Sequence, residues 1–170
     1  FSLLGGLLVM NQFVRILEKI QMALGVIFLT IFFVTIVFQI VTRHMGISVI
    51  WTEEVANYSF IWAMFMGAAV TVNRKEHFSF DFLQRKLTGK KLIILNIIID
   101  LILILFNLAL FIYGLQVVER FWNYNWAALT QMKMGYVWIS IPIMAGTMII
   151  YLLNHLINHV KAFRTKEVNE

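Results

Sequence analysis

Four long apolar stretches, separated by polar segments, limit the folds that this sequence can adopt. An α-helix that crosses a bilayer needs about 20 consecutive, mostly apolar residues. The chain is 61% hydrophobic with a mean hydropathy of +0.81, whereas soluble domains are about 45–50% apolar. We therefore predict an all-α integral membrane protein with four transmembrane helices, at approximately 20–41, 53–73, 92–118 and 137–157.

The membrane domain is expected to begin at Met10. Residues 1–9 lack the basic segment and the small-residue cleavage site of a signal peptide. Because Met10 resembles a natural start, residues 1–9 are interpreted as upstream or artificial sequence. Residues 10–170 are then expected to form a single four-helix domain.

Basic residues are divided unequally between the two ends of the predicted helices. Three of the 14 lysines and arginines, namely Arg43, Arg120 and Lys133, flank the connections near 42–54 and 119–136. All the others flank the termini and the 73–91 connection. Because cytoplasmic segments carry the excess of Lys and Arg, both termini are predicted to be cytoplasmic. The sequence pI of about 9.6 then indicates contact with anionic lipid headgroups at that edge, not with nucleic acid.

The 73–91 connection contains a second, shorter amphipathic pattern. Phe78, Phe82 and Leu87 can share one helical face, while Arg85 and Lys86 reach lipid headgroups. This pattern predicts a short helix at about 78–87 that lies flat in the membrane interface.

The histidines provide no clear metal or haem site. His155 and His159 are four residues apart and share a helix face, as in some zinc and haem pairs. No third ligand lies nearby in the sequence, and His44 and His77 fall outside the predicted spans. The chain also has no cysteine, which excludes disulfides and thiolate chemistry. We expect neither a metal, a cofactor nor a catalytic site, so the chain is not expected to be an enzyme.

Asp100 is an acidic residue inside the third predicted span, on the order of 13 Å from its start. An intramembrane carboxylate is by default a candidate functional group. The alternative is a polar seam between helices, which Asn96 and Asn107 would share with Asp100. The first interpretation leads to a stand-alone, proton-coupled four-helix transporter. Because no partner base was found in the other helices, the seam is favoured.

The connection at 119–136 mixes apolar and charged residues, and two interpretations of it remain open. It either docks a protein partner or rests on lipid. The candidate docking residues on this side of the membrane are Arg43, Arg120, Trp122, Trp126 and Lys133.

Residues 51–81 carry a specific combination of motifs. The segment resembles the small membrane subunit, of the four-helix Q type, of tripartite ATP-independent periplasmic (TRAP) transporters. Outside it, the resemblance rests on length and helix number alone. The matching residues are Trp51-Thr-Glu-Glu54, Trp62, Phe65-Met-Gly-Ala-Ala69 with Gly67 at its centre, Arg74 and His77-Phe-Ser-Phe-Asp81.

The resemblance implies a non-catalytic subunit of a sodium-coupled importer in the bacterial inner membrane. In that family a large polytopic subunit carries the substrate, and a soluble periplasmic protein delivers it. The substrate is usually an organic acid, such as a C4-dicarboxylate or a sialic acid. We further hypothesise that Glu53 and Glu54 form charge-assisted hydrogen bonds at the start of the second helix. Arg43 or the large subunit would supply the partner.

Overall fold

The computed structural model describes the backbone of residues 2–74 and 89–168, and the side chains of residues 9–74 and 89–163. The predicted interfacial helix at 78–87 lies outside the described residues, as do the motif residues His77 and Asp81.

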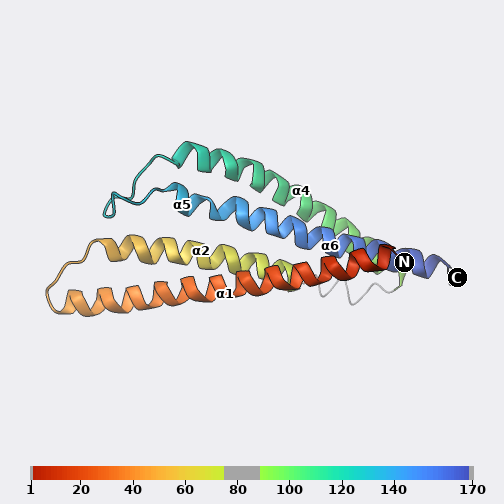
Figure 1. The fold of residues 1–170 in the computed structure, drawn as a ribbon, viewed down its shortest axis with the longest axis horizontal. Helices are drawn as coiled ribbons and strands as arrows, with labels where there is room; N and C mark the ends of the chain where they lie inside the picture. The colour runs from red at the N-terminus through yellow and green to blue at the C-terminus, as the bar shows by residue number, and fades with distance from the viewer. Residues whose placement is uncertain (1, 75–88, 169–170) are drawn as a thin grey trace.

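The described part of the chain contains five helices (Figure 1). It includes four helical segments that are long and apolar enough to cross a membrane. This confirms the predicted all-α membrane fold. The second and third segments match the predicted spans closely, whereas the first begins at Val9, well before residue 20, and the last continues to Phe163, past residue 157. Helix bounds are α1 (Ser2–His44), α2 (Trp51–Arg74), α4 (Lys90–Phe121), α5 (Gly135–Trp138) and α6 (Ser140–Val168).

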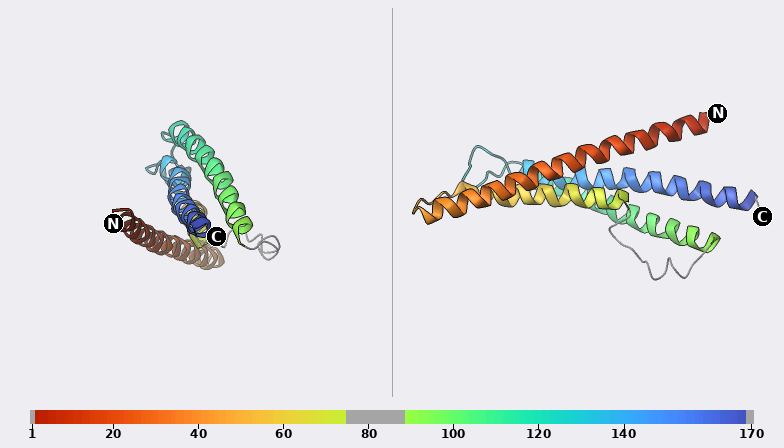
Figure 2. Two further views of the ribbon diagram at one scale, coloured as in Figure 1. Left: turned by 90° about the vertical axis from the view of Figure 1, so that its right-hand side faces the viewer. Right: turned by 90° about the horizontal axis from the view of Figure 1, so that it is seen from below.

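The helices form two antiparallel hairpins that lie side by side. Helix α1 packs along α2, α4 packs along α6, and α2 and α6 join the two hairpins. Both termini lie at one end of the bundle, which we call the inner end. The opposite, outer end carries the α1–α2 turn and the outer loop, residues 122–134. Toward the inner end, α1 and α4 spread to opposite sides of α6 (Figure 2).

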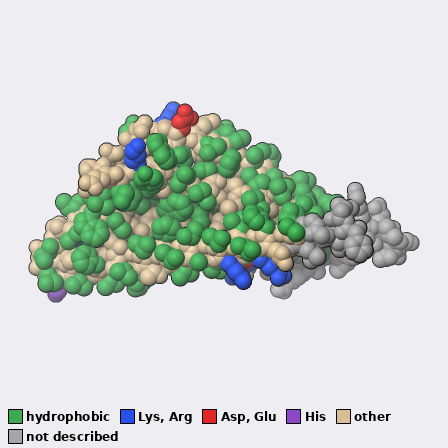
Figure 3. All heavy atoms as spheres, in the orientation of Figure 1, with side chains coloured by type: hydrophobic (Ala, Val, Ile, Leu, Met, Phe, Trp, Pro, Cys, Tyr) green, Lys and Arg blue, Asp and Glu red, His purple; other side chains and the backbone are tan. Residues whose placement is uncertain are grey.

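The core lies where α2 meets α6. Ala69 and Tyr151 are fully buried there, and Met148 and Leu152 pack around them. Elsewhere the apolar side chains face outward, and charged side chains are confined to the margins of the face drawn in Figure 3. An apolar exterior of this kind suits a lipid environment, because there is no penalty for exposing hydrocarbon to acyl chains.

Helix α4 contacts α6 through a row of residues spaced by seven. The buried residues of α4 are Ile93, Asp100, Asn107 and Gly114. A seven-residue repeat keeps one face of a helix against a gently supercoiled neighbour. Near the outer end, a Cβ atom on Gly114 would lie 2.9 Å from the Ile141 side chain, so this glycine permits close approach of the two helices.

The hydrogen-bond pattern of the last span is interrupted near its outer end. Helix α5 ends at Trp138 and α6 begins at Ser140. Pro142 follows in the first turn of α6, where a missing N–H is tolerated because those groups lack intrahelical partners. The sequence predicts a kink near Pro142, and the interruption at Ile139 lies just before it.

Candidate functional site

The outer loop is attached to the first turn of α2 by one carboxylate. Glu54 Oε1 accepts a hydrogen bond from the Ala127 amide at 2.6 Å, and Oε2 accepts from Ala128 and Leu129 at 3.0 and 3.2 Å. Three consecutive N–H groups therefore converge on one anion, an arrangement that stabilises the charged form and fixes the loop backbone. Hydrogen bonding was hypothesised for both Glu53 and Glu54, and among the described residues the side chain of Glu54 alone of the two has such bonds. Its donors belong to this same chain, and Arg43 is not among them.

Aromatic contacts on the same side of α2 reinforce this attachment. The Trp62 indole N–H donates to the Tyr136 carbonyl at 3.0 Å, and its ring stacks on Phe28 of α1 at 5.3 Å. Tyr58 packs against Trp126 with ring centroids 4.4 Å apart. Aromatic pairs at such separations contribute about 0.5–1.5 kcal/mol beyond their buried area. The motif residue Trp62 thus links α1, α2 and the start of α5.

The outer loop also folds back on itself. The Trp126 amide donates to the Met132 carbonyl at 2.9 Å, and the Trp126 indole donates to the Lys133 carbonyl at 3.2 Å. The Trp122 ring covers Gly135, where a Cβ atom would lie 2.3 Å from Trp122 Cε3. A larger residue at position 135 therefore has no room. The loop is a compact structure, not an extended connection.

Glu53 has an environment quite unlike that of its neighbour. It is exposed and, together with Arg43, lines a hollow of about 380 Å³ at the tip of the α1–α2 hairpin. Within the described ranges, neither residue has an ion-pair or hydrogen-bond partner. Trp51 stacks loosely on Phe38, with ring centroids 6.1 Å apart.

The five candidate docking residues do not form a single patch. Trp122 and Trp126 are half-buried and pack inward on Gly135 and Tyr58. Arg120 is exposed at the end of α4, Lys133 is half-buried in the outer loop, and Arg43 lies at the other hairpin tip.

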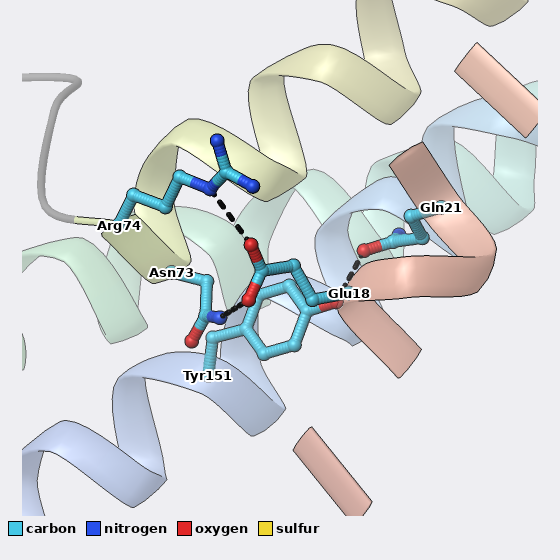
Figure 4. A network of polar contacts seen from close by, with 5 residues as sticks. All are labelled: Glu18, Gln21, Asn73, Arg74 and Tyr151. Atoms are coloured by element: carbon cyan, nitrogen blue, oxygen red, sulfur yellow. Dashed lines mark hydrogen bonds and ion pairs between the residues drawn. The ribbon is translucent and has the colours of Figure 1, made fainter. Parts of the chain in front are cut away.

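At the inner end, a second carboxylate connects the two helices of the first hairpin. Glu18 of α1 accepts hydrogen bonds from Asn73 Nδ2 at 2.8 Å and from Arg74 Nε at 2.7 Å (Figure 4). The motif residue Arg74 is therefore oriented by a carboxylate that the sequence analysis did not select. Only the position of Glu18 near the predicted membrane boundary could have pointed to it.

One turn further along α1, Gln21 crosses from the first hairpin to the second. It is buried and donates through Nε2 to Thr147 Oγ1 at 2.8 Å. Its Oε1 accepts from the Tyr151 hydroxyl at 2.5 Å (Figure 4). The Gln21 carbonyl oxygen and the Tyr151 hydroxyl each thereby have a hydrogen-bond partner inside the apolar core. The pair therefore sets the register between α1 and α6.

Asp100 has a partner that the sequence analysis missed. Its Oδ2 lies 2.8 Å from His159 Nδ1 of α6, and only 8% of the Asp100 side chain is exposed. The inference that no base in the other helices faces Asp100 was wrong. His159 lies just past the end of the fourth predicted span, and the antiparallel packing of α4 on α6 brings it to the carboxyl group.

The remaining seam residues differ in their surroundings. Asn107 is buried and donates to the Leu103 carbonyl of its own helix, while its Oδ1 has no partner among the described residues. Asn96 is half-buried and lies off the seven-residue row. Gly67 is exposed on α2, and a Cβ atom there would meet nothing within 4 Å. Over residues 9–74 and 89–163, no group of three metal-ligating side chains comes together.

Taken together, these elements define a multi-pass helical membrane protein whose outer loop is attached to the acidic start of its second span. The family model of tripartite ATP-independent periplasmic transporters, DctQ component, matches residues 32–162. The chain belongs to this family of transporter components.

A relative in Haemophilus influenzae has the provisional name TRAP transporter small permease protein. The two sequences are 29% identical over 99 residues. The alignment covers 56% of this chain and 60% of the relative, so it spans less than two thirds of that protein's length.

Proposed function

We propose that this chain is the small membrane subunit of a transporter that imports an organic acid together with sodium ions. A large polytopic membrane subunit would carry the substrate, and a soluble periplasmic protein would deliver it. The observation that carries the proposal is the attachment of the outer loop to Glu54, within the segment that resembles small TRAP subunits. Membership of the DctQ family supports it.

In this role the chain acts as a scaffold. A buried polar contact at Gln21 links its two hairpins, and the contact at Asp100 links the two helices of the second hairpin. Both contacts resist sliding of one helix past another. A bundle fixed in this way can brace the immobile part of a large subunit while another part moves substrate. The chain itself would bind no substrate, in keeping with a non-enzymatic, cofactor-free subunit.

The outer loop is the proposed docking surface for the periplasmic binding protein. Because Glu54 holds the backbone at 127–129, side chains on the far side of the loop are presented on a fixed frame. Tyr124 is among the most exposed of them, and Arg120 lies exposed at the adjoining end of α4. In this proposal the outer end faces the periplasm, and both termini are cytoplasmic.

The experiment is co-expression with the large membrane subunit and the binding protein, followed by affinity purification and sodium-driven uptake in proteoliposomes. Uptake of a C4-dicarboxylate and of a sialic acid is measured in parallel, because the binding protein selects the substrate. We expect the large subunit to co-purify and uptake to require both membrane subunits. We also expect Glu54→Ala to lower uptake more than Glu53→Ala.

Two results would overturn the proposal. One is intact co-purification and uptake when both Glu53 and Glu54 are alanine, which would remove the role of the motif. The other is uptake by this chain alone that is lost in Asp100→Asn. That outcome would favour a stand-alone proton-coupled transporter.

A further inference from the structure

A groove follows the line along which α1 and α2 pack, from the inner end toward the middle of the bundle. Two hollows, of about 280 and 440 Å³, adjoin there and share Met22, Val26 and Arg74 in their linings. We call their union the seam groove. Its surface is mostly apolar, and nothing lies within 4 Å of a Cβ atom built on Gly67. Residues lining its apolar part are Met22, Gly25, Val26, Ala63, Gly67 and Val70.

The length of the seam groove matches one leaflet of a bilayer. On α1 it extends from Lys19 to Leu29, and on α2 from Arg74 to Ala63. At about 1.5 Å per residue, each segment is roughly 15 Å long. The hydrocarbon core of a bilayer is about 30 Å thick, so one leaflet contributes about 15 Å. A groove for a partner helix would continue through both leaflets, whereas this one ends near the midplane.

The inner mouth of the groove carries the charges that a lipid phosphate requires. Lys19 is exposed there and has no ion-pair partner among residues 9–74 and 89–163. Arg74 lies on the facing helix and is held in place by its Nε bond to Glu18 at 2.7 Å. Glu18 lines the same mouth, but its oxygens already accept from Asn73 and Arg74. Among residues 9–74 and 89–163, Glu18 offsets one of the two cations at this mouth, which leaves the charge of Lys19.

We propose that the seam groove binds an anionic phospholipid, with its phosphate between Lys19 and Arg74 and one acyl chain against Gly67 and Val26. The lipid belongs to the leaflet at the inner end. Close packing of the acyl chain in the groove contributes dispersion contacts, and the two cations select the headgroup. This inference concerns the isolated chain and stands apart from the proposed transport function.

Native mass spectrometry of the delipidated full chain in detergent tests it, with palmitoyl-oleoyl phosphatidylglycerol as the titrant. The wild type is expected to retain one lipid with a defined dissociation constant. Gly67→Leu fills the groove and should weaken binding about tenfold, since several methylene contacts are displaced. Val26→Phe blocks the same groove from α1. Lys19→Gln should weaken binding about fivefold and reduce the preference over phosphatidylethanolamine.

Matched controls separate the groove from general effects. Ala109→Leu enlarges an exposed small residue on α4, and Lys91→Gln removes an exposed charge at the inner end of the other hairpin. Both are expected to bind lipid as the wild type does. Thermal unfolding of each variant in detergent confirms that it is folded.

Equal lipid retention in Gly67→Leu, Val26→Phe and the wild type would overturn the proposal. If Lys19→Gln kept the headgroup preference of the wild type, the proposed position of the phosphate beside Lys19 would be wrong. Should Gly67→Leu retain lipid normally but no longer co-purify with the large subunit, the groove would be assigned to a partner helix instead.

Discussion

His159 Nδ1 lies 2.8 Å from Asp100 Oδ2, in a contact that joins α4 and α6 in a largely buried position. The two side chains are 15% and 8% exposed, respectively. The contact gives each of these polar side chains a hydrogen bond in an apolar environment, where an unpaired polar group is costly. The contact thus explains how an acidic residue is accommodated inside a span without requiring it to carry protons.

Removing one member of this pair should destabilise the bundle. Asp100→Leu removes the carboxyl group that His159 Nδ1 contacts, and His159→Leu removes the ring nitrogen that Asp100 Oδ2 contacts. We expect each to lower the free energy of unfolding by about 2 kcal/mol, less than for fully buried pairs because His159 is partly exposed. Unfolding in a denaturing detergent, followed by tryptophan fluorescence, measures the change.

The double variant provides the decisive comparison for that prediction. With both groups replaced by leucine, no polar group is stranded, so stability should return to within about 1 kcal/mol of the wild type. Additive losses in the double variant would mean that the two side chains act independently, contrary to the observed contact.

Glu54 should control the mobility of the outer loop. Glu54→Gln removes the charge and one of the two acceptor oxygens that hold Ala127, Ala128 and Leu129. Hydrogen bonds to charged groups contribute about 1.5–3 kcal/mol, so these amides should exchange at least about tenfold faster. Hydrogen–deuterium exchange with mass spectrometry measures this. Glu53→Gln is the matched control and should leave the exchange unchanged, because Glu53 bonds no described residue.

Two glycines should respond in opposite directions to the same substitution. Gly135→Ala places a methyl group against the Trp122 ring, with the built Cβ 2.3 Å from Cε3. Overpacking of this kind should cost about 1–3 kcal/mol. Gly67→Ala fills open space inside a helix and should stabilise the fold by about 0.5–1 kcal/mol. The measurement is the midpoint temperature of thermal unfolding in detergent. A shift of this temperature in the same direction for both variants would contradict the different packing described for the two glycines.

The Gln21–Tyr151 contact predicts an asymmetry between its two partners. Tyr151→Phe removes the donor to Gln21 Oε1 but keeps the Nε2 bond to Thr147. Because an unpaired carbonyl oxygen is tolerated better than an unpaired donor, the loss should be about 1 kcal/mol. Gln21→Leu leaves the hydroxyl of Tyr151, a fully buried residue, without an acceptor and should cost about 2–3 kcal/mol. Equal losses, measured by unfolding of the two variants, would show that the hydroxyl finds another acceptor.

Composition and periodicity were sufficient for the architecture. The four spans follow from apolar length alone, because in lipid a helix is the structure that satisfies every backbone group of an isolated segment. Of the three polar residues that the sequence grouped into a seam, Asp100 and Asn107 are buried on α4, whereas Asn96 is half-buried. Such signals depend on residues that are close together in the chain, so they can be recognised in a single sequence.

Partners across helices were harder to predict, because they depend on register. His159 meets Asp100 only once the outer loop has fixed how far α6 slides along α4, and no pattern in the sequence sets that distance. Glu54 posed a different difficulty. Its donors are main-chain amides more than 70 positions away, and every residue type except proline has one.

That use of main-chain donors has an evolutionary consequence. The carboxylate of Glu54 recognises the shape of the backbone at 127–129 and is indifferent to the side chains there. Substitutions at these positions, proline excepted, leave the attachment in place. The side chains of this part of the outer loop can therefore vary among related chains, while the bundle beneath them needs no compensating change.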